Sequence, residues 1–230
     1  CLWFLLFLQQ HAPRYVRYLV NSYKGMKTPP LFHYILLLSA LWLCSCNRPE
    51  KTYYETGELK EEIYKDKDGK NHGTYLRYHL EGGVAEEASF EHGKPNGVRK
   101  LFYVTGQMES ESQFVNGQLN GYHRVYYPSG KLMIDAVNKN NALNGTFKKF
   151  NEDGSLQEVV TFTDGEENGP FEEYYKNGKI KWKGTYRNGD QEFGLLERFD
   201  STGVLVKTMM CDSLSICRTT WLKEGYEDKE

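Results

Sequence analysis

Hydrophobic and polar residues recur along this chain every 24 or 25 residues, and the same kinds of side chain return at the same places. One column is aromatic in every copy and consists of Tyr78, Phe102, Tyr126, Phe150, Tyr174 and Phe199. A second column is aliphatic and consists of Leu59, Val84, Met108, Leu132, Leu156, Ile180 and Leu205. A fixed period of this size indicates stacked copies of one small structural unit.

Glycines run in phase with these columns. One glycine column consists of Gly73, Gly97, Gly121, Gly145, Gly169 and Gly194, and another of Gly82, Gly106, Gly130, Gly154, Gly178 and Gly203. A third column has Asn141 in place of glycine in one copy. Asparagine tolerates positive φ better than most residues, so this third column is predicted to adopt positive φ.

The turn inside each copy predicts how its two strands pair. Pro128 cannot take positive φ, which excludes a type I′ turn between Tyr126 and Leu132. A type I turn with Gly130 in the left-handed region fits a three-residue hairpin with a bulge. This register pairs Tyr126 with Leu132, so the aromatic and aliphatic columns should share one side of the sheet. The turns between copies, such as 91–97, are expected to be longer.

The predicted fold is all-β: an elongated, single-layer antiparallel meander of about 24-residue β-hairpin repeats, behind an N-terminal helical signal segment. Six copies and a partial seventh occupy 53–211, and 212–230 should form a C-terminal cap or tail. Val84, Ala88 and Phe90 are an even number of residues apart, so they are expected on one face of their strand. That face would be the core face of the sheet.

The opposite face is predicted to carry exposed aromatic side chains that bind a partner. These candidate binding residues are Tyr75, Tyr103, Tyr127, Phe147, Phe171 and Tyr175. The alternative is that they pack across strands and stiffen a thin sheet.

Charge and motifs exclude several classes of function. The formal net charge of the chain is −2, and residues after 45 are more acidic still, which argues against nucleic-acid binding. No nucleophile stands beside a recognisable base, and His72 and His92 read as solvated turn residues. We therefore expect no enzyme activity, no cofactor and no metal site.

The N-terminal part reads as an export signal. Met26 and Lys27 precede an apolar run from Leu31 to Leu43, which suits a signal peptide at 26–45. The ending Leu43-Cys44-Ser45-Cys46 resembles a bacterial lipobox, which implies lipid attachment to Cys46, a tether at 46–52 and a place in the bacterial cell envelope. We expect the anchor to lie in the outer membrane, on its periplasmic or its surface side. Residues 1–25 are interpreted as translation from upstream of the true start or as a membrane-embedded extension. An ordinary membrane anchor, or a cleaved signal without lipid, remains an alternative to the lipoprotein.

Two cysteines near the end form a candidate disulfide. Five residues separate Cys211 from Cys217, and outside the cytoplasm the two cysteines could close a small loop. Two thiols are the alternative.

The repeat resembles the variant MORN repeat of the YwqK-type antitoxin family. The resemblance lies in Tyr126-Tyr127-Pro128-Ser129-Gly130-Lys131-Leu132, in Phe114-Val115-Asn116-Gly117 and in Glu173-Tyr174-Tyr175-Lys176-Asn177-Gly178-Lys179-Ile180. It implies a repeat surface that binds another protein or an envelope glycan, or alternatively an antitoxin that neutralises a toxic polypeptide.

Overall fold

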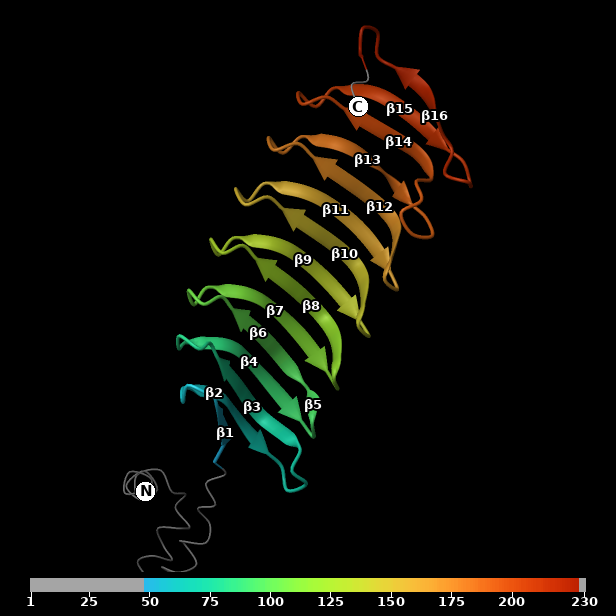
Figure 1. The fold of residues 1–230 in the computed structure, drawn as a ribbon. Helices are drawn as coiled ribbons and strands as arrows, with labels where there is room; N and C mark the ends of the chain where they lie inside the picture. Colours follow the sequence, from blue (N-terminus) through green and yellow to red (C-terminus); the bar gives the residue numbers. More distant parts are fainter. Residues whose placement is uncertain (1–47, 228–230) are drawn as a thin grey trace, which may run out of the picture. The chain divides into compact units, whose positions relative to one another are not determined.

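The computed structural model describes residues 48–227, which form one antiparallel sheet of 16 strands (Figure 1). The strands follow one another in chain order, except that β5 lies off this path and pairs only with β4. The strands are β1 (Glu50–Tyr53), β2 (Leu59–Lys65), β3 (Asn71–Tyr78), β4 (Val84–Glu91), β5 (Lys94–Pro95), β6 (Gly97–Phe102), β7 (Met108–Val115), β8 (Gln118–Tyr126), β9 (Leu132–Lys139), β10 (Ala142–Phe150), β11 (Leu156–Thr163), β12 (Glu166–Tyr174), β13 (Ile180–Tyr186), β14 (Gly194–Phe199), β15 (Leu205–Cys211) and β16 (Cys217–Leu222). The predicted all-β meander of hairpins is confirmed.

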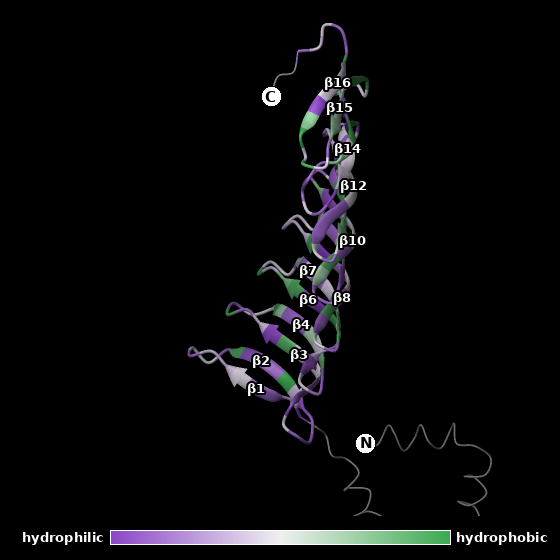
Figure 2. Cartoon of the chain, turned by 90° about the vertical axis from the view of Figure 1, so that its right-hand side faces the viewer, coloured by the Kyte–Doolittle hydropathy of each residue, from purple (hydrophilic) through white to green (hydrophobic). Residues whose placement is uncertain are grey.

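The sheet is a single layer, as the view near its edge in Figure 2 shows. Within the described residues no helix or second sheet covers either face. That part of the chain also holds no helix of the length and apolarity needed to span a membrane. The predicted signal segment at 26–45, the lipidation site Cys46 and the extension at 1–25 lie outside the described residues.

The tight turns have the predicted geometry. In the turn between β8 and β9, the Tyr127 amide donates to the Lys131 carbonyl at 2.8 Å and the Gly130 amide donates to the Tyr127 carbonyl at 2.7 Å. Gly130 has φ 81°, which glycine adopts without steric cost. Tyr126 pairs with Leu132, so the predicted register of this hairpin is confirmed.

Four turns between copies, those after β4, β7, β9 and β11, are shorter than the sequence analysis predicted. Val115 pairs with Gln118 across two residues only, Asn116 and Gly117, whose φ values are 52° and 86°. Two successive residues at positive φ are typical of a type I′ hairpin turn. Asn141 has φ 71°, so the positive φ predicted from its column is confirmed.

The prediction that Val84, Ala88 and Phe90 share one face is wrong. Val84 pairs with Tyr78, but the next pairing joins Glu86 to Arg77, so Ala85 is an extra residue in a β-bulge. A bulge inserts one residue into one strand, and the side chains beyond it change face. The same register shift recurs in the other tight-turn hairpins.

The bulges sort the side chains onto two faces. Face A carries Tyr75, Phe147 and Phe171 together with the Ala88 and Phe90 columns, and face B carries the aromatic column of Tyr78 and the aliphatic column of Val84. Among the described residues, the buried ones that pair across strands lie on face A: Ile63, Glu86, Ala88, Ser110, Ser112, Ala136, Asn138, Val160, Phe171, Leu196 and Cys211. Face A is therefore the better-packed side of the sheet.

Candidate binding surface

Three of the predicted binding residues connect neighbouring copies through their hydroxyl groups. Each hydroxyl donates to a backbone carbonyl in the following copy: Tyr103 to Tyr126 at 2.8 Å, Tyr127 to Phe150 at 2.9 Å and Tyr175 to Phe199 at 2.9 Å. Tyr54 makes the same bond to Tyr78 at 2.7 Å. We call these bonds the tyrosine staples. They favour cross-strand packing, the alternative that the sequence had left open for this column.

The remaining three predicted residues lie on face A. The Tyr75 hydroxyl donates to Glu61 Oε1 at 3.1 Å, and its ring meets the Phe90 ring edge-on at 5.8 Å between centroids. Phe147 packs against Phe162 at 5.8 Å. Phe171 is only 4% exposed. The prediction that Phe171 is an exposed contact residue is therefore wrong, because the bulges place it among the packed columns.

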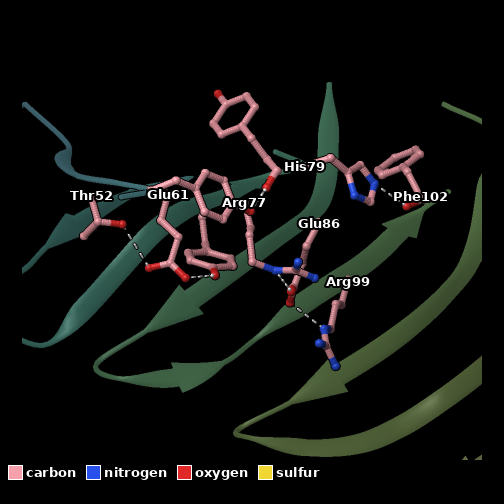
Figure 3. A network of polar contacts seen from close by, with 10 residues as sticks. Thr52, Glu61, Arg77, His79, Glu86, Arg99 and Phe102 are labelled. Atoms are coloured by element: carbon pink, nitrogen blue, oxygen red, sulfur yellow. Dashed lines mark hydrogen bonds and ion pairs between the residues drawn. The ribbon is translucent and has the colours of Figure 1, made fainter. Parts of the chain in front are cut away.

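The N-terminal half of face A is polar and internally paired (Figure 3). The Glu86 carboxylate accepts hydrogen bonds from Arg77 Nε at 3.2 Å and from Arg99 Nε at 2.7 Å. Figure 3 also shows His79, whose Nε2 lies 2.9 Å from the Phe102 carbonyl oxygen, in the place that a tyrosine staple takes elsewhere. Because its buried carboxylate already has two cationic partners, this half offers little unsatisfied charge to a ligand.

The C-terminal half of face A is aromatic. We call the rings of Phe147, Phe162, Phe171, Trp182 and Tyr186 the aromatic patch. The Phe171 and Tyr186 rings are stacked, with centroids 4.1 Å apart and an interplanar angle of 19°. Phe162, Trp182 and Tyr186 are only partly buried, and they pack on the buried cluster of Val160, Phe171, Leu196 and Cys211. The patch is thus supported from below by the buried cluster and is partly open to solvent at its surface.

Four carboxylates surround Tyr186 on the same face, and we call them the acid ring: Glu158, Glu167, Glu173 and Glu192. Cross-strand pairing places them there, since Phe162 faces Glu167 and Tyr186 faces Glu192. Burial, and then the carboxylates of the ring, raise the pKa of the Tyr186 hydroxyl to about 12.

Burial and like charge also act within the acid ring. Glu158 lies directly opposite Glu173 across β11 and β12, a pairing of like charges that destabilises a sheet. Burial, and then the Glu173 carboxylate, raise the pKa of Glu158. The pKa of Glu167 and that of Glu192 are raised first by burial and then by neighbouring carboxylates. Lys181 Nζ lies 3.1 Å from Glu173, so the ring is only partly neutralised.

Sequence reasoning missed Phe162, Trp182, Tyr186 and the acid ring as a group. Tyr174 pairs with Ile180, and Trp182 is two residues after Ile180. Without a bulge, strand alternation would therefore place Tyr174 and Trp182 on one face. In the structure Trp182 pairs with Glu173 and lies on face A, whereas Tyr174 lies on face B. Only Glu167 and Glu192 stand at equivalent places, two residues before Gly169 and Gly194, so the sequence carried little signal for the acid ring.

The predicted cysteine pair is joined in the structure. Cys211, the last residue of β15, and Cys217, the first of β16, form a disulfide. Cys211 belongs to the buried cluster beneath the aromatic patch, and Cys217 packs against that cluster. It therefore fixes the end of the sheet close to the candidate binding surface.

Comparison with known proteins identifies the repeat. A family model described as the MORN repeat variant matches five stretches, at residues 49–66, 95–116, 119–137, 143–164 and 167–188. No curated protein matches the chain. Among solved structures, the Tc holotoxin pore from Photorhabdus luminescens aligns with 70% of this chain and 11% of its own chain, at 14% identity and a TM-score of 0.20. At that TM-score the alignment supports no statement about function.

Proposed function

We propose that this chain of MORN-variant repeats is a non-enzymatic binding module whose aromatic patch and acid ring capture a polypeptide segment rich in lysine or arginine. The observation that carries the proposal is the placement of four carboxylates around partly exposed aromatic rings on one face of the sheet. A cationic side chain would interact with both, since it pairs with carboxylates and lies favourably over aromatic rings.

The energetics of the acid ring support a cationic partner. Glu158 and Glu173 repel each other in the free protein, and burial penalises the charge on Glu158. A bound ammonium or guanidinium group would relieve that repulsion. Charge clustered at a cost to stability is typical of a functional surface rather than a structural one.

We also propose that the module works in the cell envelope, attached through lipid on Cys46. This part of the proposal rests on the lipobox-like sequence and on the apolar run before it. Mass spectrometry of the mature protein from cells should find a lipid-modified Cys46 as its first residue. A mature chain that begins at another residue would refute the anchor.

Charge reversal on the two faces tests the binding surface. A fluorescent peptide of alternating arginine and tyrosine residues serves as the probe, and a peptide of equal length with aspartate in place of arginine serves as the negative control. Glu158→Lys with Glu173→Lys should weaken binding about tenfold or more, because it replaces attraction with repulsion. Glu172→Lys with Glu197→Lys makes the same change of net charge on face B and should leave the affinity nearly unchanged.

The outcomes separate the alternatives. If the two double variants lose affinity equally, only net charge matters and face A is no specific site. If neither basic nor acidic peptide binds but an envelope glycan does, the aromatic patch is a sugar platform instead. Should the natural partner be a toxic polypeptide that this protein neutralises, the antitoxin role implied by the family resemblance would follow.

A further inference from the structure

The sequence analysis expected His72 and His92 to be separate, solvated turn residues, but the fold brings them together with Asp66. Asp66 follows β2, His72 lies in β3 and His92 follows β4, all at one margin of the sheet. Each residue offers one donor atom, and the three donor atoms lie within 4.8 Å of one another. The imidazole rings of His72 and His92 have centroids 5.3 Å apart.

The Asp66 carboxylate is held in place by its own turn. Its Oδ1 accepts the amides of Asp68 and Lys70, both at 2.9 Å. Its Oδ2 remains for His92, whose Nδ1 lies 3.0 Å away. Hydrogen bonds of this kind, which fix one oxygen and direct the other, orient the ligands of metal sites.

The backbone of His92 is also held in place by its turn. It has φ 48° and takes the first position of a two-residue turn, whose second residue, Gly93, donates its amide to the Asn71 carbonyl at 2.7 Å. That bond joins the turn to the residue next to His72. The equivalent turn positions in the following copies hold Asn116, Asn140, Asp164 and Asn188, with φ between 52° and 56°. The turn itself therefore does not require histidine at this position.

We propose that Asp66, His72 and His92 bind a divalent transition-metal ion of the Zn²⁺ class at the margin of the sheet. Two imidazoles and one carboxylate form a ligand set that suits zinc, with metal–ligand distances of about 2.0–2.2 Å. The three donor atoms lie within 4.8 Å of one another, so small side-chain movements would bring all three to these distances from a single ion. Both histidines are exposed, so water can complete the coordination. Calcium and magnesium prefer oxygen ligands and are not expected to bind.

The site is independent of the proposed binding surface. Its residues lie just after β2, in β3 and just after β4, whereas the aromatic patch and acid ring lie on β10 to β13 and just beyond β13. Loss of metal binding would therefore leave capture of a basic segment unaffected, and the reverse also holds.

Calorimetric titration of the full chain with ZnCl₂ tests the proposal, with free thiols alkylated first under non-reducing conditions so that cysteines outside the disulfide do not bind zinc. His92→Asn is the main variant, because asparagine occupies the equivalent turn positions and should keep the turn. We expect one zinc ion per chain at this site, and a loss of affinity of about tenfold or more in His92→Asn. Asp66→Asn, which can keep the bonds to the turn amides, should lose affinity as well.

A matched control moves the histidine without changing the composition. His92→Asn combined with Asn116→His places imidazole in the next equivalent turn, away from Asp66 and His72, and should not restore binding. The inference is overturned if the native chain takes up no zinc at millimolar concentration, which would leave only a hydrogen bond between His92 and Asp66. It is also overturned if His92→Asn binds zinc as tightly as the native chain.

Discussion

Removing the tyrosine staples should destabilise the sheet without changing its binding surface. The perturbation is the triple substitution Tyr103→Phe, Tyr127→Phe and Tyr175→Phe, which keeps each ring and deletes only the hydroxyl. Each hydroxyl donates to a carbonyl of the following copy at 2.8 or 2.9 Å. The substitutions therefore remove three hydrogen bonds between copies and little packing.

The size of the effect follows from the geometry. A hydrogen bond within a protein contributes about 1 kcal/mol net, and a carbonyl left unsatisfied costs more where water cannot reach it. Neighbouring copies lie two strands apart, about 10 Å, so their contributions should add. We expect the triple variant to lose about 3 kcal/mol of unfolding free energy, measured by urea titration followed by circular dichroism.

A matched control separates the hydroxyl from the ring. Tyr78 belongs to the aromatic column of face B, and its hydroxyl makes no hydrogen bond within the described part of the chain. Tyr78→Phe should therefore change the unfolding free energy by less than about 0.5 kcal/mol. If the triple variant unfolds at the same urea concentration as Tyr78→Phe, the staples do not hold the copies together. If it instead loses the basic peptide at unchanged stability, the tyrosines are contact residues after all.

Three further predictions concern packing, charge and covalent closure. A methyl group at Gly184 would lie 2.1 Å from Leu196 Cδ2, so Gly184→Ala should cost about 1–3 kcal/mol in urea unfolding, and Leu196→Ala in the same chain should cost less than the sum of the two changes. The raised pKa of Glu158 means that the folded protein keeps this proton to higher pH than the unfolded chain, so stability falls as pH rises through and above the ordinary value of 4.5. Glu158→Gln should therefore raise the melting temperature at pH 7 but not at pH 4, and Glu152→Gln in an exposed turn should do neither. Cys211→Ser removes the disulfide and should cost about 2 kcal/mol, measured against the native chain without reductant.

Turn chemistry made much of the fold predictable. Pro128 excluded one turn type and glycine two residues later supplied the left-handed position, so the pairing of Tyr126 with Leu132 followed from the sequence. The 24-residue period then extended that hairpin along the chain. These features are local, and local steric rules determine them.

The binding face was not predictable in the same way. A β-bulge after each aliphatic column adds one residue to the strand, and no residue type marks it: the extra residue is Ala85 in one hairpin and Met133 in another. One added residue moves every later side chain to the other face, so Phe90 was assigned wrongly. The convergence of His72 and His92 was missed because it joins the start of β3 to the turn after β4.

Site-specific photo-crosslinking in living cells tests most directly whether face A is the binding surface. A photoreactive phenylalanine replaces Tyr186, at the centre of the acid ring, or Tyr174 in the same copy on face B. Crosslinks from position 186 to a lysine- or arginine-rich segment of one polypeptide, with none from position 174, are the expected result. Crosslinks to that partner from position 174 alone, or equally from both positions, would contradict it.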